Sequence, residues 1–350
     1  MKLNHQRYKR AYSMFRNRIN GELQKAKRDY YKLYFDNNIT NMKKTWKGIK
    51  DILNLKGKND QHISQISSNN KLISDEKEIA NVFNNFFINV GTKLDSEIPK
   101  TNTKLSPNSF LGDKNEQSLQ LNPTTPTEII DIIDLLDDTK SSGPINIPIK
   151  ILKIAKHHIA VPLSDICNAS FIEGKFPEKN KIAKVIPIHK KGCTNDVNNY
   201  RPISLLPIFS KIMEKLMAKR LNVFLQENSI LCNNQFGFRP GFSTEHSLMA
   251  IIETIKKTIE EKKYGCGVFI DLKKAFDTVN HKILLHKLEH YGIRGEALSW
   301  FESYLKDRQQ YVTINKTSST LLTVKCGVPQ GSVLGLLLFL LYINDLPNIS

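Results

Sequence analysis

The hydrophobic residues Val268, Ile270 and Leu272 occupy every second position between residues 267 and 272, where they alternate with Phe269 and the polar Asp271. A period of two is typical of a β-strand that packs one face against a core. Asp271 falls on the opposite face, near the end of the alternation. The pattern therefore predicts a strand that presents one carboxylate, and hard cations such as Mg2+ prefer oxygen ligands of this kind. A surface aspartate at a strand end has the same pattern, so the metal-binding interpretation stays open.

Apolar residues recur every three or four positions over much of the remaining chain, as in helices with one buried face. Ser74 and Ser243 are suitable N-caps, and Gly292 is a suitable helix end. The predicted helices lie within 1–56, from Ser74 through Val90, over 127–138, over 150–171 with an interruption at Pro162, over 209–226, after Ser243, and over 279–291, 296–305 and 333–343.

Two further regions have strand patterns. Residues 184–192 resemble an edge strand, because Pro187 has no N–H to donate to a neighbouring strand. Residues 310–315 and 320–325 alternate around a short polar segment, 316–319, which predicts a hairpin. The predicted connections are a polar linker at 57–72, a loop at 101–126 and a domain boundary near residue 120.

Positive charge is concentrated at the start of the chain. The 350 residues include 51 Lys and Arg against 34 Asp and Glu, a net charge of +17, and residues 1–60 alone hold 16 basic residues against five acidic ones. Basic helices with interleaved aromatic residues suit a phosphate backbone and stacked bases, so nucleic acid is the expected partner. A solvated helical pair with an aromatic seam is the alternative.

Cysteine usage and hydrophobicity narrow the class of protein further. Five widely spaced cysteines without a Cys-x-x-Cys pair favour a reducing, intracellular compartment over a zinc ribbon. The basic N-terminus does not resemble a secretion signal. The longest apolar run, Val333–Ile343, is too short for a bilayer, which needs about 20 residues. We therefore expect a soluble protein.

Four short motifs occur in order along the second half of the chain. They are Tyr200–Leu206, Gln235–Arg239, Phe269–Asp271 with Ala275–Asp277, and Gly327–Gly335. This ordered set resembles the reverse transcriptases, and most closely the polymerases of non-LTR retrotransposons of the jockey-like kind. The similarity covers roughly residues 120–350, and the basic segment before it resembles the connector that follows an endonuclease domain in full-length elements.

The resemblance implies an α+β fold with the fingers and part of the palm of a right-hand polymerase. The fingers would occupy about residues 121–262 and the partial palm about 263–350, preceded by a basic helical connector over 1–120. It also implies RNA-directed DNA polymerisation, with an RNA template, a DNA primer and deoxynucleoside triphosphates, in the nucleus or in a cytoplasmic ribonucleoprotein.

The resemblance also assigns roles to individual residues. Asp271 resembles the first metal-binding carboxylate of a site with two Mg2+ ions (or Mn2+), which would activate the primer 3′-hydroxyl and stabilise the leaving pyrophosphate. Phe276 resembles the ring that excludes a 2′-hydroxyl by a clash, and core packing is its alternative role. The remaining assignments are Lys190 or Lys191 with Arg201 for the triphosphate, Gln330 and Gly331 for the nascent base pair, and Gln235, Gly237, Phe238 and Arg239 for the template.

The chain also departs from the family pattern. Ile145 stands where the family usually has Asp, and Leu336 stands where it usually has Pro, so we expect a disturbed start to the last helix. The aromatic-Ala-Asp-Asp turn, which supplies the other catalytic carboxylates, is absent before Ser350. We therefore expect this chain to be inactive alone. A non-catalytic nucleic-acid-binding remnant and a group II intron-type maturase are the alternative functions.

One competing pattern points to a different class of enzyme. His286, Glu289 and His290 match the H-x-x-E-H arrangement of inverted zinc peptidases, in which two histidines on one helix face bind Zn2+. No third ligand is identifiable in the sequence, and a pattern this short arises easily by chance. We expect Glu289 and His290 to lie on a solvated face beside Lys287.

Overall fold

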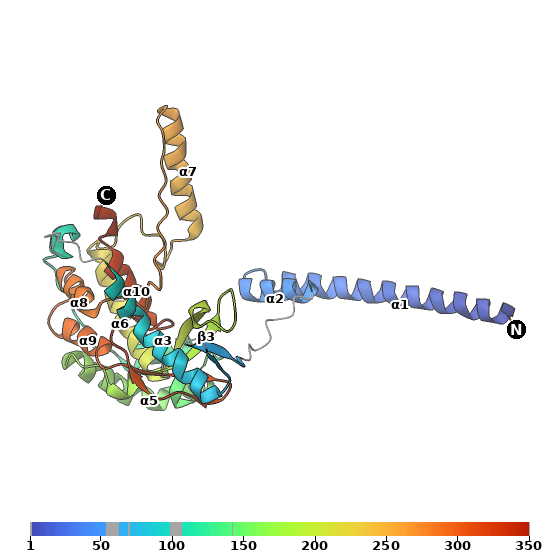
Figure 1. Cartoon of the computed structure of the whole chain (residues 1–350), viewed down its shortest axis with the longest axis horizontal. Coiled ribbons are helices and arrows are strands. Elements are labelled where there is room, and N and C mark those ends of the chain that lie inside the picture. The colour runs from blue at the N-terminus through green and yellow to red at the C-terminus, as the bar shows by residue number, and fades with distance from the viewer. Residues whose placement is uncertain (1, 54–62, 69–70, 99–106, 142, 350) are drawn as a thin grey trace. The chain divides into compact units, whose positions relative to one another are not determined.

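The computed structural model describes residues 2–53, 63–68, 71–98, 107–141 and 143–349 (Figure 1). The chain divides into two compact units, Met1–His62 and Ile63–Ser350. The expected boundary near residue 120 falls inside the second unit. The assignment of residues 1–120 to a connector, and of the remainder to fingers and palm, stays a prediction.

The first unit consists of two helices, α1 (Lys2–Asp36) and α2 (Met42–Ile52), as the apolar spacing predicted. Asn41 caps α2 by accepting a hydrogen bond from the Lys44 N–H. Gly48 is buried against the rings of Tyr34 and Phe35, where a Cβ atom would lie 2.7 Å from Tyr34. Aromatic contacts therefore join the two basic helices.

The second unit mixes helices with one main sheet, which confirms the predicted α+β class at this level of detail. Its strands are β1 (Ile66–Ser68), β2 (Lys71–Ile73), β3 (Ile182–His189), β4 (Tyr200–Leu205), β5 (Gln309–Ile314), β6 (Thr317–Ser318) and β7 (Leu322–Thr323). Its α-helices are α3 (Glu76–Glu97), α4 (Pro126–Asp134), α5 (Ile149–Ile172), α6 (Ile208–Glu227), α7 (Thr244–Glu260), α8 (His281–His290), α9 (Glu296–Leu305) and α10 (Val333–Ile343).

The main sheet has the order β4-β3-β5-β6, and β7 pairs with β5. β3 runs antiparallel to β4 and parallel to β5. Helix α3 packs on this sheet through Phe83 and Phe87, which share a core with Val185 and Val312. A larger core among the helices contains the fully buried side chain of Trp300. The sheet and its helices thus hold segments that are far apart in the sequence.

The predicted strand over residues 267–272 is wrong, because the structure describes this segment as extended but unpaired. Val268, Phe269 and Ile270 are 80%, 92% and 72% exposed. An isolated strand is unstable in water because no pairing or packing offsets the conformational entropy lost on ordering it. None of the strand pairings among the described residues includes this segment, so the alternation in its sequence finds no partner.

Several smaller predictions also need correction. Residues 66–68 and 71–73 form a hairpin within the expected linker, and Ile66 is fully buried there. Asp75, one residue after Ser74, caps α3 by accepting from the Glu78 N–H. Helix α5 continues through Pro162. Thr317 and Ser318, assigned to the hairpin connection, belong to β6 and pair with β5.

Strand β3 has a neighbour on both sides only at Lys184 and Val185, in its middle, so it is an edge strand only in part. Residues 182–185 pair with β5, whereas residues 186–189 pair with β4 alone. Pro187 lies in the second half, directly opposite Pro202 of β4. The proline is therefore accommodated where the strand has a single neighbour, as its missing N–H requires.

Candidate active site

The turn formed by Gly327–Ser332 connects two of the predicted nucleotide-binding segments. The N–H of Val328 donates to the carbonyl oxygen of Phe276 at 2.8 Å. The N–H of Ser204 in β4 donates to the carbonyl oxygen of Gln330 at 2.7 Å. The Gly327 N–H also donates to the Val279 carbonyl. The backbone thus joins the segment around Phe276 to the turn that carries Gln330, and both to β4.

Two glycines make this close approach possible. Gly331 has a φ of +110°, and a Cβ atom on it would lie 2.9 Å from the Ser204 carbonyl oxygen. Gly327 has a φ of +86°, and its Cβ atom would lie 3.0 Å from the Cα atom of Asp277. Any L side chain at these positions would be strained and would push the segments apart.

The start of α10 follows this turn and is held by a buried carboxylate. Ser332 caps the helix by accepting from the Gly335 N–H at 2.9 Å. Glu214 of α6 accepts from the Val333 N–H at 2.7 Å and from the Tyr304 hydroxyl at 3.3 Å. Burial raises the pKa of Glu214, against the opposing positive charge of Arg308. The helix begins regularly at Val333, so the disturbance expected from Leu336 is not observed.

Phe276 packs between aromatic rings from two other segments. Its ring centroid lies 4.8 Å from that of Phe339 in α10 and 6.2 Å from that of Phe238. Phe238 belongs to the predicted template loop and is 55% exposed. The structure therefore brings the predicted sugar-selecting residue next to the predicted template segment.

The other side chains of the predicted template loop make contacts within that loop. Gln235 donates its side-chain amide N–H to the Gly237 carbonyl at 3.0 Å, and Arg239 donates to the Cys232 carbonyl at 2.9 Å. The Arg239 guanidinium also lies 4.5 Å from the centre of the Phe242 ring. These contacts fix the loop conformation, and the predicted contact of these residues with a template stays a prediction.

Positive side chains meet where β3 ends and β4 begins. Lys190 follows β3, and its N–H donates to the Asn199 carbonyl at 2.8 Å, while Arg201 lies in β4. The Lys274 ammonium donates to the Tyr200 carbonyl at 3.1 Å. Burial, and then the charges of Lys190, Lys273 and Arg201, lower the pKa of Lys274, so these cations lie near it. Lys274 lies between Asp271 and Phe276, but the sequence alone indicated no role for it.

Asp277 ends the Ala275–Asp277 motif, and the sequence alone indicated no role for it. Burial raises its pKa to about 6, against the opposing charge of Lys274. Its Oδ2 atom has no hydrogen-bond partner among the described residues, and the same holds for Nη2 of the buried Arg308. Both residues line a cavity of about 40 Å3 beside Gln330. This volume is large enough for a water molecule, which could bridge two polar groups.

The structure does not assemble a complete metal site around Asp271. This residue is exposed and lies on the unpaired segment that leads to Phe276. Among the described residues, no group of three or more His, Cys, Asp or Glu side chains has an arrangement that could hold a metal ion. Asp271 provides the carboxylate oxygens that Mg2+ prefers, but it is one ligand of the several that such an ion needs.

The H-x-x-E-H residues lie on α8, but their environment is not that of a zinc site. The His290 ring nitrogen Nε2 is 3.1 Å from the Asp113 carbonyl oxygen, and Glu289 is exposed. Lys287, which we expected on a solvated face, is buried and pairs with Asp345 at 2.5 Å. The long Lys287 side chain reaches Asp345, two residues after the end of α10. This face of α8 is therefore packed against that segment rather than solvated.

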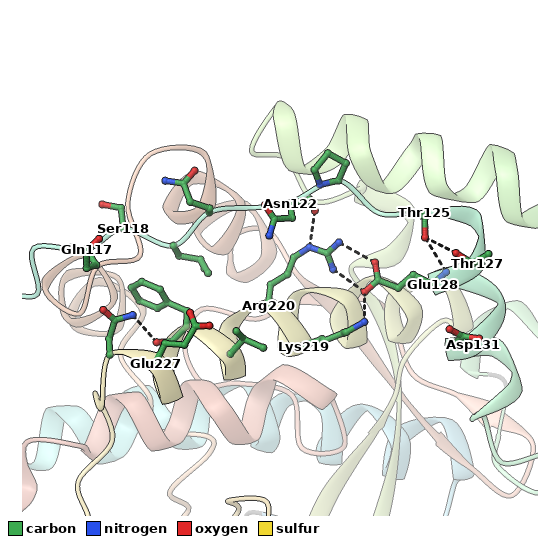
Figure 2. Close-up of a pocket in the computed structure, with 16 residues that line it drawn as sticks. Gln117, Ser118, Asn122, Thr125, Thr127, Glu128, Asp131, Lys219, Arg220 and Glu227 are labelled. Carbon is green, nitrogen blue, oxygen red and sulfur yellow. Dashed lines mark hydrogen bonds and ion pairs between the residues drawn. The ribbon is translucent and has the colours of Figure 1, made fainter.

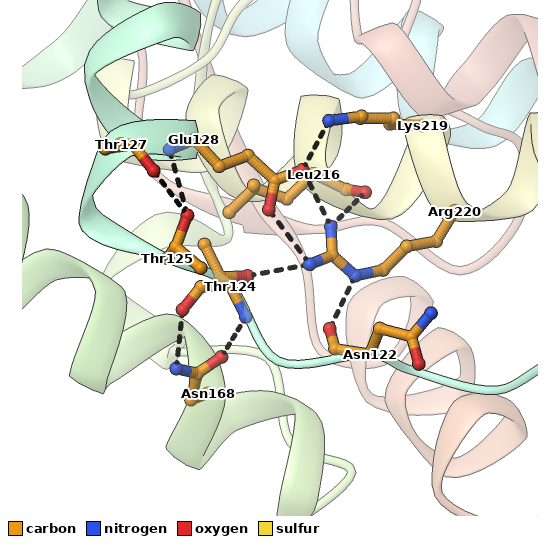
Figure 3. Close-up of polar contacts among 9 residues, drawn as sticks. All are labelled: Asn122, Thr124, Thr125, Thr127, Glu128, Asn168, Leu216, Lys219 and Arg220. Atoms are coloured by element: carbon orange, nitrogen blue, oxygen red, sulfur yellow. Dashed lines mark hydrogen bonds and ion pairs between the residues drawn. The ribbon is translucent and has the colours of Figure 1, made fainter.

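A cavity of about 780 Å3 lies between the segment 117–125, α4 and α6, and none of these predicted site residues lines it (Figure 2). Arg220 lines this cavity and donates hydrogen bonds to both carboxylate oxygens of Glu128 (Figure 3). The same guanidinium donates to the carbonyls of Asn122 and Leu216 and to the Thr124 hydroxyl. These bonds occupy all the donors of Arg220. The residue therefore ties α6 to the segment 122–128 rather than presenting a charge to a ligand.

Comparison with known proteins agrees with this arrangement. Residues 188–349 match the model of the family "Reverse transcriptase (RNA-dependent DNA polymerase)". The chain is 37% identical over 239 residues to a probable RNA-directed DNA polymerase from transposon BS of Drosophila melanogaster, covering 66% of this chain and 26% of that protein. It is 33% identical over 234 residues to the RNA-directed DNA polymerase from mobile element jockey of the same organism, covering 67% of this chain and 25% of that protein.

The fold, the motifs and these matches define the chain as carrying a reverse transcriptase domain. It belongs to the jockey-like reverse transcriptases of non-LTR retrotransposons, which confirms the family expected from the four motifs. The chain spans about a quarter of the length of the relatives that it matches. Among the described helices, none combines the length and the hydrophobicity that crossing a bilayer requires.

Proposed function

We propose that this chain contributes the nucleotide- and template-binding part of an RNA-directed DNA polymerase. The observation that carries the proposal is the backbone connection of the Gly327–Ser332 turn to Phe276 and to β4. This connection unites residues from three separate motifs beside a group of cations. Such a surface suits an anionic nucleotide held over a template.

In this proposal Lys190 or Lys191 and Arg201 bind the triphosphate. The planar guanidinium of Arg201 suits bidentate contact with phosphate oxygens, and a lysine acts as a mobile point charge. Phe276 excludes a 2′-hydroxyl by a steric clash, supported on its other side by Phe339. The alternative role of this ring is core packing against Phe339.

Gln330 and Gly331 contact the nascent base pair in this proposal. Gly331 permits close backbone approach, and the Gln330 amide can both donate and accept a hydrogen bond. The Gln235–Arg239 loop approaches the template strand through its exposed Phe238 ring, which can stack on a base. The expected partners are an RNA template, a DNA primer and deoxynucleoside triphosphates, in the nucleus or in a cytoplasmic ribonucleoprotein.

Reverse transcriptases generally use divalent metal ions, and Mg2+ (with Mn2+ as an alternative) is the cation we propose. Asp271 would hold it with one carboxylate, and bound metal would supply charge neutralisation at the phosphates and activation of the primer 3′-hydroxyl. The exposure of Asp271 leaves this carboxylate accessible to such an ion. The remaining residues bind and orient the nucleotide.

A primer-extension assay on an RNA template with Mg2+ tests the proposed function. We would compare this chain with a version to which the aromatic-Ala-Asp-Asp turn of the family has been added after Ser350. Extension by the longer version that Asp271→Asn abolishes would support the proposal. Extension by the shorter chain would show that the metal site has been misplaced.

Absence of extension in both versions, with retained RNA binding, would favour the non-catalytic alternative. A matched control is Asp165→Asn, which changes an exposed aspartate of α5. This substitution should leave extension unchanged. Loss of extension in the control would indicate a general effect of the removed charge.

A further inference from the structure

We propose that Lys274 binds the pyrophosphate portion of the incoming nucleotide together with Lys190 and Arg201. The inference rests on the proposed function and adds a residue that lies outside the predicted triphosphate set. It assigns a phosphate-contacting role to the turn between Asp271 and Phe276. Charge, backbone conformation and position each support it.

Two other segments contact the Lys274 ammonium. It donates to the Tyr200 carbonyl at 3.1 Å and lies 5.4 Å from the centre of the Phe86 ring of α3. An ammonium has three N–H donors, and the Tyr200 carbonyl is its one hydrogen-bond partner among the described residues. Lys274 is therefore directed toward the start of β4 while keeping donors for a further acceptor.

The charge around Lys274 is unbalanced. Lys190, Lys273 and Arg201 are close enough to lower the pKa of Lys274, after burial as the main cause. Asp277 is the carboxylate whose charge opposes this effect. None of the four cations makes an ion pair within 4.0 Å in the described part of the chain. The Tyr200 carbonyl that Lys274 contacts lies between Asn199, which accepts from the Lys190 N–H, and Arg201. Four cations near one carboxylate favour an anionic ligand.

The backbone at Lys274 is held in an unfavourable conformation. Its φ of +53° lies in the left-handed region, which residues with a Cβ atom rarely adopt. The N–H of Asp277 donates to the Lys274 carbonyl at 2.8 Å and closes the turn. Strained conformations of this kind concentrate at functional sites, where they hold a side chain in a required direction.

The same features select the class of ligand. A nucleoside triphosphate and free pyrophosphate carry more negative charge than a nucleoside monophosphate, so a group of cations prefers the first two. A lysine also retains contact with a moving phosphate, because its ammonium is a point charge on a flexible stem. We therefore assign Lys274 to the end of the triphosphate that departs rather than to the phosphate that is joined to the primer.

Equilibrium binding of inorganic pyrophosphate and of a deoxynucleoside monophosphate to the full chain tests this inference. The titrations are made at low salt without divalent metal, so that the readout depends on the protein cations. Lys274→Met keeps an unbranched side chain beside Phe86 and removes the charge. Loss of a charge-assisted hydrogen bond should weaken pyrophosphate binding by roughly tenfold or more, with a much smaller effect on the monophosphate.

Two variants separate charge from structure. Lys274→Arg should retain most of the pyrophosphate affinity, and Lys256→Met, which removes an exposed charge on α7, should leave it unchanged. A melting temperature close to that of the unmodified chain would show that Lys274→Met folds. If Lys274→Met does not fold, Lys274→Gln replaces it in the titrations. An unchanged pyrophosphate affinity in Lys274→Gln would then overturn the inference.

The outcomes also separate this inference from the proposed function. If Lys274→Met leaves pyrophosphate affinity unchanged while Arg201→Met lowers it, the triphosphate site stands and the role of Lys274 is wrong. If Arg201→Met and Lys190→Met have no effect either, the proposed triphosphate site itself fails. A chain that does not bind pyrophosphate at all would overturn both.

Discussion

Asp277→Asn should change how the stability of the protein depends on pH. Asp277 packs beside the Gly327–Ser332 turn and lines the same small cavity. Burial raises the pKa of its carboxyl from 3.8 to about 6. The Oδ2 atom has no hydrogen-bond partner among the described residues. The folded protein therefore holds the carboxyl proton more tightly than the unfolded chain does.

The sign and the magnitude follow from this difference. Between about pH 4 and pH 6 the folded state binds more protons, so the free energy of unfolding falls as the pH rises. The pKa of Asp277 differs by about two units between the folded and unfolded states. At roughly 1.4 kcal/mol per unit, this difference corresponds to about 3 kcal/mol in the free energy of unfolding. Asparagine cannot ionise, so Asp277→Asn should gain up to about this amount relative to the unmodified chain between pH 4 and pH 7.

Urea unfolding at several pH values between 4 and 8 measures this difference. The other titrating groups are common to both proteins, so the difference in the free energy of unfolding isolates residue 277. Asp165→Asn on α5 provides an exposed control. A pH-independent difference between Asp277→Asn and the unmodified chain would refute the reasoning, since it would mean that the folded state does not alter the Asp277 proton affinity.

Three further predictions concern the turn, the sugar contact and the basic helices. Gly331→Ala should destabilise the protein by about 2 kcal/mol in urea unfolding, because the φ of Gly331 is positive and a Cβ atom there would meet the Ser204 carbonyl. Gly265→Ala should have little effect, and equal destabilisation by the two substitutions would contradict the prediction. Phe276→Val in the version extended after Ser350 should incorporate ribonucleotides in primer extension, and unaltered sugar selectivity would exclude a steric role. Deleting residues 1–62 should weaken RNA binding and flatten its dependence on salt, measured as the slope of affinity against salt concentration, and an unchanged slope would exclude this segment as the contact surface.

The sequence predicted most helices, because their determinants are local. Ser332 and the apolar run after it specify α10, and Ser243 specifies the start of α7, where it accepts from the His246 N–H. Pro162 misled the prediction because a proline removes one hydrogen bond without necessarily ending a helix. Its effect depends on whether the surrounding packing, here that of α5 against α4 and α9, maintains the helix on both sides.

The strand prediction at 267–272 failed for a related reason. Alternation shows that a segment is suited to a sheet, but pairing requires a second strand that supplies the opposite hydrogen-bonding groups. Conversely, the short strands β1 and β2 have little alternation, yet they pair with each other and bury Ile66. Whether a segment becomes a strand was therefore decided by its neighbours.

The chemistry of the site depends on contacts between distant segments even more strongly. Asp277 and Lys274 are ordinary residues in the sequence, and each acquires its properties from other elements: Asp277 from burial beneath the Gly327–Ser332 turn, and Lys274 from Tyr200 and the cations around it. The resemblance to reverse transcriptases assigned roles to Phe276 and Gln330, and these roles stay predictions. The resemblance did not point to Lys274, since the role proposed for it follows from the meeting of β3, β4 and the turn at 273–278. If the proposed site is correct, a substitution at Tyr200 or at the end of β3 should therefore alter nucleotide binding through Lys274 without contacting the nucleotide itself.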